Sequence, residues 1–229
     1  MYHLLPNLYR LVLKALSAKT GPDRMTSNLR RYREMTDITN INIRTENNYS
    51  ELKREAMVLQ KKGLPFMMAS VVIWTAVTIV RSLPVDIMTK NLYTFYCPGL
   101  LIPCVLIFSL IIGARPFSKR NNPFNKLGLI NTMNQMLYLL IVMWAFNQKP
   151  EAMLMLFAMV FGAHLLPFSW LYESKTYLVM SLVTTIGSLL ISIFLPEVYV
   201  GIFMIVCQIV MSVLLLIECR KLDRENVRG

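Results

Sequence analysis

Six long stretches of the chain carry no charged side chain, and they follow one another from residue 63 to residue 217. Each is 18 to 24 residues long, and a helix needs about 20 apolar residues to cross a hydrocarbon core roughly 30 Å thick. Lipid offers no partner to open backbone groups, so each stretch must be helical. The pattern predicts an all-α, polytopic membrane helix bundle of six transmembrane helices, at residues 63–80, 91–114, 127–148, 152–172, 176–196 and 198–217.

The basic residues between these stretches predict the orientation. One side of the membrane would hold 21 Lys and Arg, in the N-terminal segment, the 114–126 loop, Lys175 and the tail. The other side would hold only Arg81, Lys90 and Lys149. If only the N-terminal cations within 20 residues of the first span are counted, the ratio is still 14 to 3. Cytoplasmic segments carry the excess of Lys and Arg, so both termini are predicted in the cytoplasm, N-in and C-in.

The segment before the first span divides into two predicted parts. Residues 49–62 begin with a sequence like a capping box and place Leu52, Ala56 and Leu59 at helical spacing, which predicts a basic amphipathic juxtamembrane helix. Residues 1–48 are expected to be poorly ordered or to lie on the membrane surface, and the Asn- and Thr-rich part at 35–48 to be irregular. A second interpretation, in which Met35 is the biological start, explains the first 34 residues equally well. The six-helix transmembrane domain would then cover 63–217 and a cytoplasmic tail 218–229.

Composition narrows the possible partners and chemistry. The formal net charge of +11 would suggest nucleic acid in a soluble domain, but 55% of the residues are apolar and the charge sets membrane orientation. We therefore expect a lipid bilayer as partner and no nucleic acid, with anionic lipid head groups and a homo-oligomer both compatible with the sequence. No cleavable signal peptide is expected. The four cysteines form no CxxC pair and are interpreted as small buried hydrophobic residues, at positions 97, 104, 207 and 219.

Polar residues inside the predicted spans are the candidate site. Asn131, Asn134, Gln135 and Tyr138 share one face of the third span, and amides on one stripe cannot face lipid cheaply. His164 lies at a similar depth in the fourth span. The stripe predicts either interhelical hydrogen bonds or a polar cavity in the cytoplasmic half of the bundle. The candidate cavity residues are Asn131, Asn134, Gln135, Tyr138, His164 and Gln208, with Ser70, Thr184 and Thr185 at broadly similar depth.

The second span contains Pro98, Gly99 and Pro103 within six residues, which predicts a kink or local unwinding. Broken helices line substrate sites in many transporters, although a plain kink in a packed bundle is more common. No Asp or Glu lies inside any span, which argues against a pump driven by a buried carboxylate. No metal-ligand set, cofactor motif or nucleophile–base pair is visible, so neither an enzyme nor a cofactor is expected.

Several short motifs together suggest a known family. They are Lys61-Lys62-Gly63-Leu64-Pro65-Phe66 leading to Ile73-Trp74, the Pro98-Gly99 break, Asn134-Gln135 with Tyr138, and Leu166-Pro167-Phe168 with Leu171-Tyr172. In these motifs the chain, over about residues 50–217, resembles a family of small bacterial membrane proteins catalogued as a domain of unknown function. The resemblance implies a multi-pass protein of the bacterial inner (plasma) membrane, and no assigned activity or site residues.

Two functions are compatible with the sequence. The first is a small-molecule transporter or permease-like protein that uses the polar cavity. The second is a non-transporting sensor or assembly protein whose basic cytoplasmic segments bind anionic lipid or a partner. A water-accessible cavity would favour the first, and a solid bundle the second.

Overall fold

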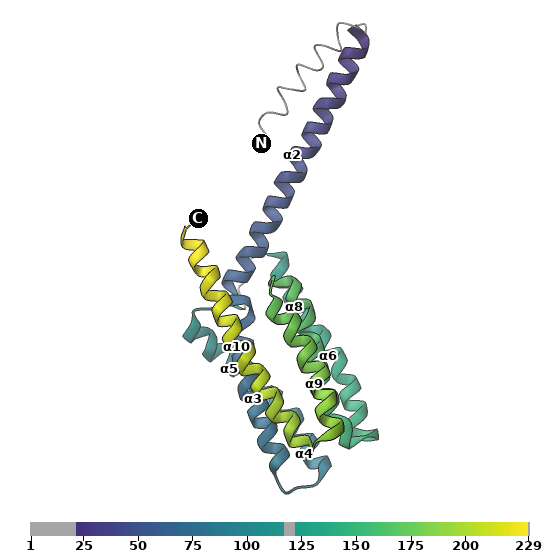
Figure 1. Ribbon diagram of the computed structural model, residues 1–229, viewed down its shortest axis with the longest axis vertical. Coiled ribbons are helices and arrows are strands. Elements are labelled where there is room, and N and C mark those ends of the chain that lie inside the picture. Colours follow the sequence, from purple (N-terminus) through teal and green to yellow (C-terminus); the bar gives the residue numbers. More distant parts are fainter. Residues whose placement is uncertain (1–21, 117–121, 229) are drawn as a thin grey trace. The chain divides into compact units, whose positions relative to one another are not determined.

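A computed structural model describes residues 22–116 and 122–228, and within them every regular element is a helix (Figure 1). The chain divides into two units, residues 1–51 and residues 52–229. The elements, with 3-10 turns written η, are α2 (Pro22–Leu59), η1 (Lys61–Gly63), α3 (Leu64–Ser82), α4 (Ile87–Tyr96), η2 (Cys97–Leu100), α5 (Leu101–Ile112), α6 (Pro123–Gln148), η3 (Pro150–Ala152), α7 (Met153–His164), α8 (Leu166–Leu171), α9 (Lys175–Phe194) and α10 (Glu197–Arg228).

Among the described residues, six helices are long and apolar enough to cross a membrane, by length and composition. They are Lys61–Ser82, Ile87–Ile112, Pro123–Gln148, Pro150–Leu171, Lys175–Phe194 and Glu197–Arg224. The prediction of an all-helical chain with six such helices is therefore confirmed. The second and fourth are composite, since α4 joins α5 through η2 and α7 is flanked by η3 and α8.

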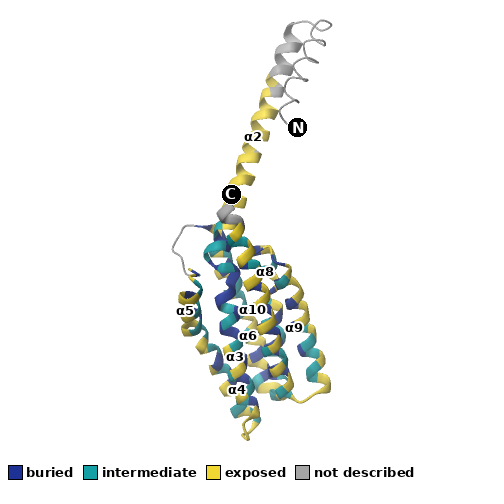
Figure 2. Cartoon of the chain, turned by 60° about the vertical axis from the view of Figure 1, so that its left-hand side comes forward, coloured by how far each residue is buried: buried dark blue, intermediate teal, exposed yellow. Residues whose placement is uncertain are grey.

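Four helices form the centre of the second unit. Helix α3 packs against α10, α10 against α9, and α9 against α7. Trp74 of α3 then contacts α7, with its ring centroid 5.5 Å from that of Phe157 and 5.7 Å from that of Phe161. Helices α5 and α6 lie outside this group, on α3 and α7 respectively. Buried residues accordingly lie on the inward faces of the helices (Figure 2).

Glycines allow two of these helix pairs to approach closely. A Cβ atom on Gly162 of α7 would lie 2.5 Å from the Thr185 hydroxyl of α9, and one on Gly201 of α10 would collide with Thr78 of α3. Small residues at such points let membrane helices pack backbone to backbone. Helix α7 therefore lies close to α9 at Gly162, and α10 lies close to α3 at Gly201.

Two segments differ from the sequence-based expectation. Residues 35–48 are helical within α2, where we predicted irregular structure, and the helix begins at Pro22 instead of near residue 49. The hydroxyls of Thr39 and Thr45 bond to the carbonyls of Met35 and Ile41 four residues earlier, so their polar groups are satisfied inside the helix. The predicted tail also continues α10 as far as Arg228.

Candidate functional site

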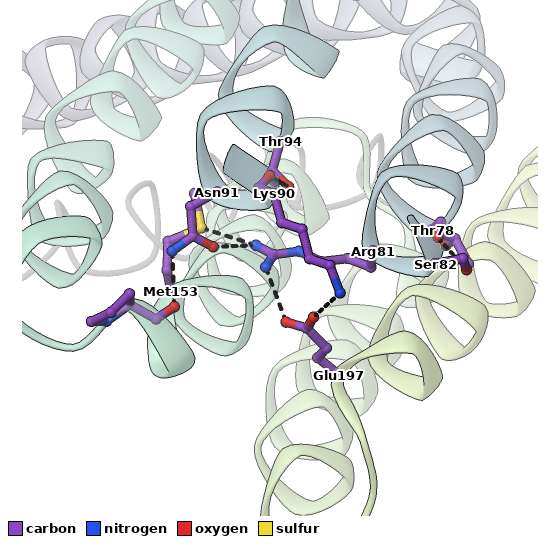
Figure 3. Close-up of polar contacts among 9 residues, drawn as sticks. Thr78, Arg81, Ser82, Lys90, Asn91, Thr94, Met153 and Glu197 are labelled. Atoms are coloured by element: carbon purple, nitrogen blue, oxygen red, sulfur yellow. Dashed lines mark hydrogen bonds and ion pairs between the residues drawn. The ribbon is translucent and has the colours of Figure 1, made fainter. Parts of the chain in front are cut away.

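A buried arginine lies at the end of α3. The Arg81 side chain has no exposed surface, and its Nη1 donates to Glu197 Oε2 over 3.0 Å, forming an ion pair with the first residue of α10. Its Nη2 donates to Asn91 Oδ1 of α4 over 2.7 Å and lies 3.4 Å from Met153 Sδ of α7. Figure 3 shows the guanidinium group between these three partners. One side chain thus joins four helices.

The partners of Arg81 are themselves fixed. Lys90 Nζ lies 3.5 Å from Glu197 Oε1, so the carboxylate is shared between two cations. Asn91 is fully buried and donates its Nδ2 to the Pro150 carbonyl over 2.9 Å. Buried charges are stable only when paired and hydrogen-bonded in this way. We call these five residues, Arg81, Lys90, Asn91, Met153 and Glu197, the Arg81 cluster.

A cavity of about 270 Å³ adjoins the Arg81 cluster. Two carboxylates, Glu151 and Glu197, and the Ser192 hydroxyl are its polar lining groups. The rest of the wall is apolar and consists of Ile87, Leu154, Met155, Leu195 and Val200. A mainly apolar concavity with a few polar groups is typical of a small-molecule site, although this volume is just below the usual range of roughly 300–1,000 Å³.

A second polar cluster lies where α2 meets α3. Lys61, Lys62 and Gly63 all have positive φ, at 46°, 48° and 74°, which breaks the helix between α2 and α3. Lys61 pairs with Asp223 at 2.7 Å and Lys62 with Glu218 at 2.9 Å, both on α10. A left-handed backbone is costly for Lys, and it persists only where the surroundings fix it.

Hydrogen bonds from other helices supply that support. The Tyr177 hydroxyl of α9 donates to the Lys62 carbonyl over 2.8 Å, and the Cys219 thiol of α10 to the Lys61 carbonyl over 3.2 Å. Glu218 also accepts from the Thr176 hydroxyl over 2.6 Å. We call this set the Lys62 cluster. Its members are Lys61, Lys62, Gly63, Thr176, Tyr177, Glu218, Cys219 and Asp223.

Buried polar groups continue beside the Lys62 cluster. The Tyr172 hydroxyl donates to Gln60 Oε1 over 2.6 Å, and Gln60 Nε2 donates to Asn125 Oδ1 over 2.7 Å. The Tyr172 phenol is the donor in this chain of hydrogen bonds, and Gln60 is both acceptor and donor. Lys53 lies in this region too, paired with Glu173 at 2.8 Å and 4.4 Å from the centre of the Trp170 ring.

Both clusters join the same two helices. The Lys62 cluster links the start of α3 to the last turns of α10, and the Arg81 cluster links the end of α3 to the first turn of α10. Between them, the Ser70 hydroxyl of α3 donates to Gln208 Oε1 of α10 over 2.9 Å. The first and last spans are therefore joined at both ends and in the middle.

The structure separates the predicted cavity residues. Gln208 is fully buried between α3 and α10, whereas Asn131, Asn134, Gln135 and Tyr138 lie on α6, which packs mainly against α7, α8 and η3. The first three are half-buried and Tyr138 is exposed. None of the six predicted residues lines the 270 Å³ cavity.

His164 lies nearer to the amides of α6 than Gln208 does. Gly128 of α6 lies next to Leu171 of α8, and a Cβ added to the glycine would be 3.5 Å from the leucine side chain. Because α6 runs antiparallel to α7 and α8, Gln135, seven residues after Gly128, lies at about the level of His164, seven residues before Leu171. The His164 ring bonds through Nδ1 to the Phe161 carbonyl in its own helix and contacts Phe161 and Phe168 edge-on. The hydrogen bond of the His164 ring is therefore made within α7.

The proline-rich region of the second span contains the η2 turn. Helix α4 ends at Tyr96, Cys97–Leu100 forms a 3-10 turn that includes Pro98 and Gly99, and α5 then begins at Leu101. Pro103 lies in the first turn of α5, where a missing N–H costs little. No group of three His, Cys, Asp or Glu side chains able to hold a metal ion occurs in residues 22–116 and 122–228.

Comparison with protein-family models places the chain in a known family. The model of a family of unknown function, DUF7010, matches residues 49–218. The chain belongs to this family. The match confirms the resemblance found in the sequence motifs, and it includes Arg81, Glu197, Lys62 and Glu218. No curated protein and no solved structure matches the chain.

Sequence reasoning missed the Arg81 cluster. Arg81 and Glu197 are 116 residues apart, and each ends or begins an apolar run, where a charged residue usually only marks the membrane boundary. The sequence does hold one signal: Arg81 follows the first apolar run and Glu197 precedes the last, so on antiparallel spans the two opposite charges lie at a similar depth.

Proposed function

We propose that this protein is a non-transporting membrane protein of the sensor or assembly class, in the inner membrane of a bacterium, with both ends in the cytoplasm. It has no enzymatic role in this proposal, and it presents α2 to a protein partner. The observation that carries the proposal is the joining of α3 to α10 at both ends and in the middle. Helices joined in this way do not separate to open a path between them without breaking ion pairs that are partly buried.

The distribution of exposed charge supports the orientation. Seven exposed cations gather at the end of the bundle that contains the Lys62 cluster, and no ion pair is recorded for them within the described chain; they are Arg54, Arg115, Lys126, Lys175, Arg220, Lys221 and Arg224. The other end exposes Lys149 together with the acidic residues Asp86 and Glu151. The excess of Lys and Arg faces the cytoplasm, so the Lys62 cluster is the cytoplasmic end.

The charge of residues 22–51 favours a protein partner over an anionic membrane surface for this part of α2. Lys53, Lys61 and Lys62 are engaged in ion pairs inside the second unit. Residues 22–51 contain five Arg and five Asp or Glu, so they carry no net positive charge. The exposed apolar side chains on this part of α2, Met35, Ile38, Ile41, Ile43 and Tyr49, suit a protein contact.

One observation favours a second candidate function. The cavity beside the Arg81 cluster has apolar walls and the Glu151 carboxylate, while its second carboxylate, Glu197, is already paired with Arg81 and Lys90. One carboxylate in an apolar cavity suits a small organic cation. In that case the protein would be a permease-like transporter that takes its substrate from the side opposite the Lys62 cluster.

Labelling of single cysteines with a membrane-impermeant thiol reagent separates the two functions. In a background with all four native cysteines replaced by serine, Cys is introduced at Gln208 or Gln135, and at Glu151 as the exposed control. A non-transporting bundle leaves Gln208→Cys unlabelled from both sides of sealed vesicles, while Glu151→Cys reacts from the outside. Labelling of Gln208→Cys and Gln135→Cys from either side would overturn the proposal and favour transport.

Photo-crosslinking in cells tests the role of α2. A photoreactive amino acid at Ile38 of α2 is compared with one at Ile107, an exposed residue of α5. We expect one protein adduct of discrete mass from Ile38 and none of that mass from Ile107. Adducts of equal yield at both positions, or none at Ile38, would contradict the assignment of α2 as the partner-binding element.

A further inference from the structure

The outward side of α10 is an apolar stripe that ends in two arginines. Four apolar side chains, each 43–59% exposed, follow one another at spacings of three and four residues; they are Val206, Val210, Val213 and Ile217. The same spacing continues to Arg220 and Arg224, which are also exposed. Residues at this spacing share one face of a helix. One face of α10 therefore runs from the hydrocarbon layer to two guanidinium groups.

The two arginines lie at the level of the phospholipid head groups. Glu218, which pairs with Lys62, belongs to the cytoplasmic end of the bundle. Arg220 and Arg224 lie two and six residues beyond Glu218, which is about 3 and 9 Å along the helix. The polar layer on each side of the hydrocarbon core is roughly 5–8 Å thick, and an arginine extends its charged head toward that layer along an apolar stem. Both guanidinium groups can therefore reach lipid phosphates.

The described chain does not neutralise this pair of cations. No ion pair or hydrogen bond is recorded for Arg220 or Arg224 among the described residues, and Glu218 and Asp223 of the same helix are paired with the two lysines of η1. Like charges four residues apart on a helix repel each other. The helix dipole does not explain the pair, because it acts within the last turn and α10 continues for four residues beyond Arg224. An anion from outside the chain would offset the repulsion.

We propose that Arg220 and Arg224 form a binding site for an anionic phospholipid of the cytoplasmic leaflet. A guanidinium group binds phosphate through two parallel N–H donors, and the apolar stripe of α10 lies directly beside the acyl chains of a lipid held there. Cationic residues next to the membrane attract the anionic lipids of the cytoplasmic leaflet. A zwitterionic head group fits less well, because its ammonium group would lie near the same two cations.

The opposite end of the bundle has no equivalent pair among the described residues. Arg81 and Lys90 both lie close to Glu197 there, and the exposed Lys149 is accompanied by the exposed acids Asp86 and Glu151. The site is therefore expected in one leaflet only. The inference does not depend on the proposed function, since neither a sensor nor a transporter requires or excludes a bound lipid on α10.

Native mass spectrometry of the full chain in neutral detergent tests the site directly, with phosphatidylglycerol as the probe and phosphatidylethanolamine as the zwitterionic comparison. We expect the protein to bind phosphatidylglycerol more tightly. Arg220→Gln/Arg224→Gln should weaken that binding about fivefold for each arginine, or about thirtyfold in all. The control Arg54→Gln/Lys126→Gln removes two exposed cations of the same end on α2 and α6, and should weaken binding by less than about threefold, because solvent screens charges away from the site. Equal dissociation constants for the two lipids, or equal losses in the two variants, would overturn the proposal.

Thermal unfolding in detergent provides a second measurement and shows that the variants fold. Without lipid, Arg220→Gln/Arg224→Gln should melt close to the native protein, because both side chains are exposed. Phosphatidylglycerol should raise the melting temperature of the native protein and the control variant but not of Arg220→Gln/Arg224→Gln, since a ligand stabilises only the folded state that binds it. Inorganic phosphate at the same concentration should not reproduce the rise, because it lacks acyl chains. An equal rise in Arg220→Gln/Arg224→Gln, or an equal rise with inorganic phosphate, would contradict a lipid site.

Discussion

The ion pair between Arg81 and Glu197 should respond unequally to loss of either partner. Arg81 has no exposed side-chain surface, whereas the Glu197 side chain is 27% exposed and also has Lys90 nearby. Glu197→Gln leaves a buried guanidinium without its counter-charge, which typically costs about 3–5 kcal/mol of unfolding free energy. Arg81→Met leaves a carboxylate that retains Lys90 and some solvent, so its main cost is the unpaired Asn91 amide, about 1–3 kcal/mol.

The double variant Arg81→Met/Glu197→Gln separates the pair from the rest of the cluster. It removes both charges, so it should cost less than the sum of the single changes, with an interaction energy of about 1–3 kcal/mol. The free energy of unfolding would be measured in bicelles by titration with sodium dodecyl sulfate, followed by tryptophan fluorescence. Lys149→Gln, an exposed cation at the same end of the bundle, is the control and should change stability by less than about 0.5 kcal/mol.

If Arg81→Met destabilises the protein at least as much as Glu197→Gln, burial does not determine the cost. If the single effects add in the double variant, the two side chains do not interact in the membrane.

Two further predictions concern local backbone structure. Gly63→Ala should destabilise the protein by about 1–3 kcal/mol, because φ is +74° and a Cβ would lie 2.7 Å from the Tyr177 hydroxyl. The control Gly113→Ala, where φ is +72° and no atom lies near the added Cβ, should cost only about 1 kcal/mol. Equal losses of unfolding free energy in the two variants would argue against the contact between residue 63 and Tyr177. Hydrogen bonds from the Thr89 hydroxyl and then the Thr89 backbone N–H lower the pKa of Asp86 below its usual range. The stability that these bonds give is present above the unfolded pKa of about 3.9 and is lost as the pH falls through the folded pKa of Asp86. Below pH 4 the melting temperature should therefore fall less steeply with pH in Asp86→Asn than in the native protein. Parallel curves of melting temperature against pH for the two proteins would contradict this.

The spans could be predicted from the sequence because lipid imposes a length and a polarity on each of them. Their approximate positions follow from apolar runs alone, and the Pro98-Gly99 pair lies in the η2 turn that separates α4 from α5. The start of α2 at Pro22 could not be predicted from apolar runs. No rule of composition indicates that an Asn- and Thr-rich segment stays helical when its hydroxyls bond back to the preceding turn.

The polar contacts were harder to predict than the spans. The periodicity of α6 places Asn131 and Gln135 on one face, but it does not reveal which helix that face meets. Gln208 shows the difficulty, since its partner Ser70 is 138 residues away and belongs to the first span. Such pairings depend on the order in which helices pack, and that order is a property of the whole bundle.

The spacing of the two clusters along α10 has a consequence for membrane thickness. Glu197 and Glu218 are 21 residues apart, which corresponds to about 32 Å along a helix, and Lys62 and Arg81 on the first span are separated by about 28 Å. These lengths match a hydrocarbon layer roughly 30 Å thick. A bilayer with much longer acyl chains would draw charged groups into its apolar layer, and a much thinner one would expose apolar helix turns to water. The protein is therefore fitted to one range of lipid chain length, at a cost of fractions of a kcal/mol for each ångström of mismatch.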